Sequence, residues 1–256
     1  MAKKISFQFL KNFNLIMAVL HFAQGLAMLY LSRDVKFPIS VSYLTFDVVT
    51  KSLVPATPHV IFNVPLALLM VAFLFMSSLA HLIISTVYNK QYNSDLEKGM
   101  NKARWIEYSL SASTMMVGIA ILVGIYDLSS LLMIFVLVAI MNLMGLVMEI
   151  MNQLTKKTEW LTYNIGVLAG GIPWIVVGLY FWAASNYGSG KIPDFVFWIY
   201  VSIFLFFNCF AINMYLQYKK IGPWKDYTYG EKVYIILSLV AKSALAWQVF
   251  AGTLRP

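Results

Sequence analysis

Seven long runs of apolar residues, separated by short polar clusters, constrain this sequence of 256 residues more than any other feature. A helix that crosses the hydrocarbon core of a bilayer needs about 20 predominantly apolar residues, and it satisfies its own backbone hydrogen bonds in lipid. The sequence therefore predicts an all-α membrane protein, a bundle of seven transmembrane helices that forms one domain over residues 1–256. The expected spans are Phe13–Leu31, Asn63–Val87, Ala103–Ile125, Leu128–Met151, Thr162–Ala184, Pro193–Tyr218 and Glu231–Ala251.

Composition supports this reading and excludes several functions. The chain is 60% hydrophobic and 12% charged, whereas soluble domains are about 25% charged. Its single cysteine, Cys209, excludes a disulfide framework and every metal site built from several cysteines. The common dinucleotide-binding, phosphate-binding, zinc-protease and serine-hydrolase motifs do not occur in the sequence. We therefore expect a protein of the cell membrane that is not an enzyme.

The longest segment outside the spans, Ser32–Phe62, has its own signals. It contains three prolines and β-branched pairs such as Val48–Val49. This pattern predicts an ordered surface loop rather than a separate domain, and a short β-hairpin is one form that it could take.

The positions of lysine and arginine predict the direction of the bundle, because cytoplasmic loops carry an excess of both. Five of the 19 lie on the side of the carboxy terminus: Arg33, Lys36, Lys51, Lys191 and Arg255. Thirteen lie on the side of the amino terminus: Lys3, Lys4, Lys11, Lys90, Lys98, Lys102, Arg104, Lys156, Lys157, Lys219, Lys220, Lys225 and Lys232. We expect a cytoplasmic amino terminus and an extracellular carboxy terminus. The net charge of +8 then reflects topology and contact with anionic membrane lipids, not nucleic-acid binding.

One cation and one anion lie where a membrane protein rarely places them. Lys242 lies eleven residues into the seventh expected span, about 16 Å from its start and thus near the middle of a core about 30 Å thick. Glu107 lies about one turn into the third span, whereas the other acids lie in loops or near span ends. A charge at this depth usually marks function. The two residues suggest an ion pair.

Physical chemistry alone leaves two roles for this lysine. It could form a structural salt bridge between the third and seventh spans. Alternatively, a desolvated lysine has a lowered pKa, and its neutral amine can condense with an aldehyde. The positively charged imine would then need a nearby carboxylate.

Polar neighbours surround both charges. Ser238 lies one turn before the lysine on the same helix face, Ser111 lies one turn after the acid, and Tyr108 lies beside the acid. His21 and His81 fall in the halves of the first two spans nearer the amino-terminal side. Each histidine could be a packed, hydrogen-bonded residue or a proton acceptor.

The chain resembles the heliorhodopsins, a family of microbial-type retinal proteins with inverted membrane topology. Four stretches carry this resemblance, which extends over essentially the whole chain. They are Ser238–Gln248 (SLVAKSALAWQ), Arg104–Ser111 (RWIEYSLS), Leu205–Asn208 (LFFN) and Gly171–Trp174 (GIPW).

The resemblance implies a cofactor and a role for each polar residue. All-trans retinal would be bound covalently to Lys242 as a Schiff base, with Glu107 as counterion and Ser238 as a hydrogen-bonding neighbour. His21 and His81 would belong to a polar cavity that accepts the proton. The protein would be a light sensor with a slow photocycle and no net ion transport. It would form a homodimer, with the first outer loop contributing to the contact.

A polyene needs flat aromatic walls and adaptable thioether packing. Tyr108 and Ser111 lie beside the counterion position and join the expected binding site. The further candidates for the pocket wall are Met115, Met141, Gly145, Trp174, Phe206 and Phe207.

Alternative functions remain open. A familiar light-driven proton pump has an acid in the third span, a hydroxyl four residues on and a second acid eleven residues on. Glu107 and Ser111 match the first two positions, but the third is Gly118, which argues against a proton or ion transporter. A light-dependent regulator of a cytoplasmic enzyme is another alternative. The unknown cytoplasmic signalling partner would bind the lysine-rich loops Tyr88–Lys102 and Lys219–Gly230.

Overall fold

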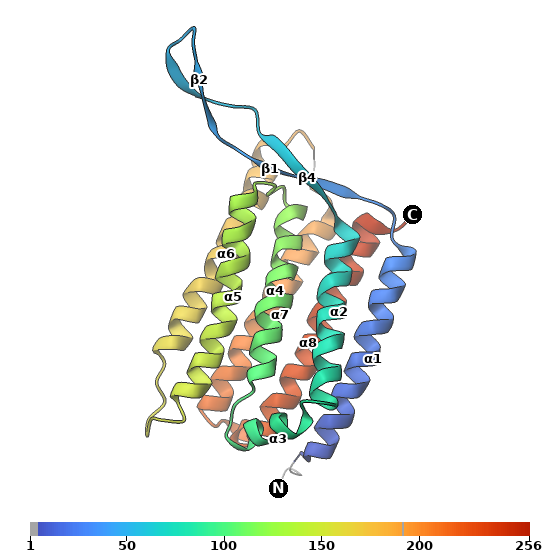
Figure 1. Cartoon of the computed structure of the whole chain (residues 1–256), viewed down its shortest axis with the longest axis vertical. Coiled ribbons are helices and arrows are strands. Elements are labelled where there is room, and N and C mark those ends of the chain that lie inside the picture. Colours follow the sequence, from blue (N-terminus) through green and yellow to red (C-terminus); the bar gives the residue numbers. More distant parts are fainter. Residues whose placement is uncertain (1–4, 191) are drawn as a thin grey trace.

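The computed structural model describes residues 5–190 and 192–256. Lys3, Lys4 and Lys191, which enter the charge count, lie outside the described residues. Seven helices in the described part of the chain are long and apolar enough to cross a membrane, as the sequence predicts, and they stand side by side (Figure 1). They are α1 (Phe7–Leu31), α2 (Leu66–Ser85), α4 (Lys102–Leu122), α5 (Leu128–Met151), α6 (Leu161–Tyr187), α7 (Asp194–Tyr218) and α8 (Tyr227–Val249), which a π-helical turn continues over Phe250–Leu254.

The two ends of the bundle differ, and we name them after the chain termini. The amino-terminal end is the one at which α1 begins, and the carboxy-terminal end is the one at which α8 finishes (Figure 1). α1 packs against α2 and α8, while α4, α5 and α6 pack in sequence order. α8 also packs against α7.

Two helices begin earlier than their apolar runs, because each has a polar cap. α1 begins six residues before the predicted Phe13, where the hydroxyl of Ser6 accepts a hydrogen bond from the backbone amide of Phe9 at 3.1 Å. α8 begins four residues before the predicted Glu231, after the capping carboxylate of Asp226. Side-chain oxygens at these positions satisfy amides that the first helical turn leaves unpaired. Apolar content alone does not reveal such polar first turns.

α4 and α6 also differ from their predicted ends. α4 finishes three residues before Ile125, because Gly124 adopts the left-handed backbone conformation (φ +97°) that ends many helices. α6 continues three residues beyond Ala184 and finishes at Tyr187, with Gly188 as its C-cap. Both differences lie within one helical turn.

A short helix that the sequence analysis treats as a polar connection, α3 (Asn89–Glu97), lies across the amino-terminal end of the bundle (Figure 1). Its buried residues are Tyr92, Asp95 and Leu96, which share one helix face. Tyr92 and Leu96 pack in one cluster with Leu10 of α1. The helix therefore covers this end of the bundle, although it is too short and polar to be a span.

The predicted outer loop Ser32–Phe62 contributes most of a long β-ribbon that extends beyond the carboxy-terminal end (Figure 1). Strand β1 (Lys36–Val41) pairs antiparallel with β4 (His59–Pro65), and β2 (Leu44–Asp47) pairs antiparallel with β3 (Ser52–Pro55). The first residues of the predicted second span thus belong to β4, and α2 begins three residues later than predicted.

The base of this ribbon is bonded to the ends of the helices. The backbone amide of Ser40 donates to the carbonyl of Tyr126 at 2.9 Å, and that of Arg33 donates to the carbonyl of Leu254 at 2.8 Å. The side chain of Ile39 is buried in the main apolar cluster of the bundle. The ribbon is therefore anchored to the bundle at its base and free at its tip.

The interior of the bundle is divided along its axis. The main apolar cluster fills the carboxy-terminal half and includes Met70, Met116, Ile203 and Leu245. Every charged side chain that is buried in the described residues lies in the amino-terminal half or at mid-bundle: Asp95, Arg104, Glu107, Glu149, Glu231 and Lys242. A polar half and an apolar half therefore meet at the level of Lys242.

The cap of α5 gives a direct test of this local structure. The carboxylate of Asp127 accepts a hydrogen bond from the backbone amide of Ser130 at 3.0 Å and also bonds the hydroxyl of Ser129. We expect Asp127→Ala to lower the free energy of unfolding by about 1 kcal/mol, measured by denaturation in detergent. Asp127→Asn, which keeps a capping oxygen, should lose less than half of that. Equal losses in both variants would contradict a role for the cap.

Candidate functional site

Lys242 lies at mid-bundle on α8, with its side chain buried. Its Nζ donates a hydrogen bond to Glu107 Oε1 on α4 at 2.6 Å and another to Ser238 Oγ at 3.0 Å. Ser238 is one turn earlier on the same helix, so the regular spacing of α8 positions it. The structure therefore brings together the cation, the anion and the hydroxyl that the sequence analysis selected.

The carboxylate of Glu107 has a further partner from a third helix. Ser77 of α2 donates to Glu107 Oε1 at 2.6 Å. Ser111, one turn after Glu107, is also buried, but its hydroxyl has no hydrogen-bond partner among the described residues. Ser77 was missed by the sequence analysis, because nothing in an apolar run with several serines distinguishes the one that faces the acid.

The two histidines stack against one another beside this cluster. The rings of His21 and His81 are nearly parallel, with centroids 5.6 Å apart and an interplanar angle of 7°. His81 Nδ1 lies 2.7 Å from Asn14 Oδ1; because an amide oxygen only accepts, Nδ1 carries the proton. Neither ring nitrogen of His21 has a partner among the described residues. Buried polar atoms normally have a partner, and His21 is the one residue in the described part of the chain with two buried polar atoms unpaired.

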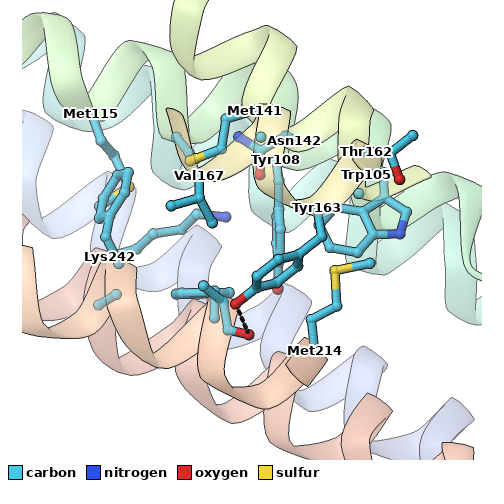
Figure 2. A pocket seen from close by; sticks show the side chains of 17 residues that line it. Trp105, Tyr108, Met115, Met141, Asn142, Thr162, Tyr163, Val167, Met214 and Lys242 are labelled. Carbon is cyan, nitrogen blue, oxygen red and sulfur yellow. Dashed lines mark hydrogen bonds between the residues drawn. The ribbon is translucent and has the colours of Figure 1, made fainter. Parts of the chain in front are cut away.

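An apolar cavity of about 110 Å³ opens beside Lys242. Figure 2 shows the lysine and the side chains of α4 to α7 around it, with the ring of Tyr108 near the middle. Five of the predicted binding-site residues line this cavity together with the lysine: Tyr108, Met115, Met141, Gly145 and Phe207. The residues that the sequence analysis did not name are Trp105, Ala112, Asn142, Thr162, Tyr163, Gly166, Val167, Phe210, Ala211, Met214 and Ala241.

Two predicted wall residues lie behind the lining instead. Trp174 packs edge-on against Phe207, with ring centroids 5.3 Å apart. Phe206 packs against the main apolar cluster. Neither residue lines the cavity: Trp174 supports its wall through Phe207, whereas Phe206 belongs to the apolar packing around the main cluster. Their selection was based on residue type alone, which does not distinguish a lining residue from its neighbour.

A close approach between α4 and α5 shapes one wall. A Cβ at Gly145 would lie 2.6 Å from the indole of Trp105, so only glycine leaves room for this ring. Trp105, Tyr108, Ala112 and Met115 recur at intervals of three and four residues on α4. That periodicity is the signal that predicts Trp105 and Ala112, because these positions share one helix face.

Between the cavity and the amino-terminal end lies a buried charge network that the sequence analysis missed. Arg104 donates to Glu149 of α5 at 2.5 Å and also to Glu231 of α8. Its guanidinium stacks 3.9 Å above the ring of Tyr234, and Trp105 Nε1 donates to Glu149 Oε2 at 2.7 Å. The network therefore joins α4, α5 and α8 on the amino-terminal side of the cavity.

Both acids of this network were expected only near the ends of spans. The structure buries Glu149 and Glu231, leaving 1% and 2% of their surface exposed. Because α3 covers the amino-terminal end and Tyr92 donates to Glu231 Oε1 at 3.0 Å, a position near a helix end is not exposed in this bundle. The sequence analysis also counted Arg104 among the basic residues on the amino-terminal side of the membrane. In the structure its side chain is buried inside the bundle.

The sequence model of the heliorhodopsin family matches residues 10–254, nearly the whole chain.

The chain belongs to the heliorhodopsin family.

A solved structure supports the fold of this heliorhodopsin. The crystal structure of the light-driven proton pump LR (Mac) from Leptosphaeria maculans superposes with a TM-score of 0.67 and covers 97% of each chain at 14% sequence identity. At this identity the likeness shows a shared fold and nothing of function. No curated protein matches the sequence.

Heliorhodopsin membership and this fold identify a multi-pass integral membrane protein and a retinal-binding photoreceptor-type protein. The residues present fit a retinal chromophore. A buried primary amine, Lys242, opens into an apolar, aromatic cavity, and a buried carboxylate, Glu107, lies beside it. The missing side chain at Gly145 keeps the wall flat where Trp105 lies.

The charge network predicts a large effect of a small substitution. Glu231→Gln should lower the free energy of unfolding of this heliorhodopsin by about 3 kcal/mol, because removing one partner leaves buried positive charge on Arg104 less compensated. Denaturation followed by circular dichroism measures this loss. Glu97→Gln, an exposed change at the same end of the bundle, is the matched control and should have no measurable effect. Similar stability in the two variants would contradict the structural role of the network.

Proposed function

We propose that this protein is a retinal-binding light sensor in which a proton moves locally and returns, without net ion transport. One observation carries the proposal. The Nζ of Lys242 lies between an apolar aromatic cavity and a cluster of polar groups, and it contacts a single carboxylate, Glu107, at 2.6 Å among the described residues. An amine that faces both environments suits a chromophore that is charged at one end.

The proposed cofactor is all-trans retinal. Lys242 would hold it through Nζ, and Tyr108, Met115, Met141 and Phe207 would contact its polyene. Bound as an imine, retinal supplies visible absorption and a light-driven change of shape. Tyr108 is held in place by its own hydroxyl, which donates to the carbonyl of Tyr234 at 3.0 Å, so this wall is rigid.

The proposed proton path is short. Glu107 Oε1 is the nearest acceptor to Nζ of Lys242. Ser77 donates a hydrogen bond to the carboxylate and Ser238 accepts one from Nζ, so each of the two groups is held in place. The stacked pair of His21 and His81 provides the next basic nitrogens within the polar half of the bundle. A proton received there stays on the amino-terminal side of Lys242 and can return to it.

The division of the interior argues against transport. Among the described residues, the carboxy-terminal half contains no buried acid that could supply a proton to Lys242 from that side. At Gly118, where a pump would have its second acid, an added Cβ would lie 2.7 Å from the end of Met70. Moving a charge through such an apolar region without intermediate sites is costly.

The direction and the partners of the protein are also proposals. The lysine-rich amino-terminal end would face the cytoplasm and contact anionic membrane lipids, and a cytoplasmic signalling partner would bind this end. A homodimer would form through the β-ribbon. Its tip supports this, because Leu44, Phe46 and Leu53 are more than half exposed there and a row of exposed apolar side chains favours contact with another chain.

Absorption spectroscopy tests the assignment of the site. The protein given all-trans retinal should develop a visible band, and folded Lys242→Ala should develop none. Glu107→Gln should shift the band to the blue or remove most of it at neutral pH, because the positive charge loses its compensating carboxylate. Glu159→Gln, an exposed acid, should leave the band unchanged. An unaltered spectrum in Glu107→Gln would remove this residue from the counterion role.

Light-driven pH changes test the absence of transport. Illuminated vesicles that contain the protein should show no sustained pH change that an uncoupler abolishes, because no staged acids continue the path beyond Lys242. The light-driven proton pump of Leptosphaeria maculans in the same vesicles is the positive control. A sustained, uncoupler-sensitive change of either sign would overturn this part of the proposal.

A further inference from the structure

The amino-terminal end contains a second, polar pocket that is separate from the proposed chromophore site. This basin has a volume of about 350 Å³, within the range of small-molecule sites. Its walls come from three connections between helices that are far apart in sequence. They are the turn before α4 (98–99), the loop between α5 and α6 (152–158) and the segment between α7 and α8 (217–227).

Five lysines line the basin, and none of them forms an ion pair with an acid in residues 5–190 and 192–256. They are Lys98, Lys156, Lys157, Lys220 and Lys225. Their ammonium groups have no ion pair or hydrogen bond with any carboxylate of the described residues. Like charges held around one space repel one another, and this raises the local affinity for an anion.

The one acid in the wall does not offset these charges. Both oxygens of Glu149 are already engaged: Oε1 accepts from Arg104 and from Tyr227, and Oε2 accepts from Trp105 and from the backbone amide of Asn101. The negative charge of Glu149 is thus compensated by Arg104, inside the bundle. The basin presents five cations and no free carboxylate.

Parts of the wall are held in fixed positions. Trp224 donates through Nε1 to Asn213 at 2.6 Å, and its ring packs edge-on against Tyr229 with centroids 5.1 Å apart. Lys220 adopts a left-handed backbone conformation (φ +52°), which is uncommon for a residue other than glycine. The lysines of this segment therefore extend from a defined turn rather than from a featureless loop.

We propose that this basin binds an anion that carries phosphate groups. Several convergent ammonium groups suit the high charge of a phosphate better than that of a single carboxylate, and lysine binds phosphate as a compact point charge. A soluble phosphorylated metabolite and an anionic lipid headgroup share this chemistry, and the basin lies at the membrane end where either could reach it.

Calorimetry on the full chain tests the proposal. The protein is placed in nanodiscs of phosphatidylcholine, and pyrophosphate is titrated in the dark at constant ionic strength. We expect saturable binding of one pyrophosphate per chain. The double variant Lys156→Gln and Lys157→Gln should weaken it by about tenfold or more, since each charged hydrogen bond lost costs a factor of this size. Because the calorimetric signal depends on neither retinal nor light, failure of this test is distinct from failure of the light-sensing proposal.

The matched control removes the same charge from the same end of the bundle. Lys11→Gln with Lys90→Gln alters two exposed lysines outside the basin, and it should bind pyrophosphate within about twofold of the unaltered chain, because exposed charges beyond a Debye length are screened. Absence of saturable binding, or equal weakening in both double variants, would overturn the proposal.

A second set of nanodiscs with phosphatidylglycerol separates the two sources of phosphate. A competing lipid headgroup would weaken pyrophosphate binding in these nanodiscs. The weakening should then occur in the control with Lys11 and Lys90 replaced, and not in the variant with Lys156 and Lys157 replaced. Unchanged affinity would identify a soluble anion as the ligand. Both results support a phosphate site in the basin.

Discussion

The buried ion pair between Lys242 and Glu107 is the interaction on which the rest of this bundle depends. Either charge alone would be costly at this depth, and a buried pair adds little stability unless its remaining hydrogen bonds are made. Ser77 and Ser238 make those bonds from α2 and α8. The pair therefore requires α2, α4 and α8 to be in register, and this register also places the two histidines and the wall of the cavity beside the amine.

On the amino-terminal side of this pair, a chain of side chains in direct contact runs from the cavity to the basin. Trp105 lines the cavity and donates to Glu149, and Glu149 in turn lies in the wall of the basin. A ligand in the basin and a chromophore on Lys242 would share this neighbour. Any effect of one on the other would be reciprocal, since coupling between binding sites is a single free energy.

The features that could be predicted from the sequence are those that depend on the length of apolar runs and on residues that are rare within a membrane. The seven spans followed from apolar runs, and Lys242 stood out because a cation at mid-membrane is unusual. Burial near a helix end was not predictable. Glu149 is enclosed by Arg104, Trp105 and Tyr227, and Glu231 is contacted by Tyr92 of α3, a helix too polar to be recognised from hydropathy. Ser77 and Trp174 show a second limit, since residue type does not reveal which face of a packed helix points to a cavity.

The order of the chain has a consequence for how the protein is made. Glu107 precedes Lys242 by 135 positions, so the ribosome has delivered the acid into the bilayer long before its cation exists. The backbone amide of Arg33 likewise cannot form its hydrogen bond until Leu254, which carries the accepting carbonyl, has been synthesised. Until the last helix inserts, the nascent bundle holds an uncompensated carboxyl group, which must keep its proton or a share of water. With retinal on Lys242, as proposed, pigment capture would be the closing event of biogenesis, and a product truncated before α8 would not acquire colour.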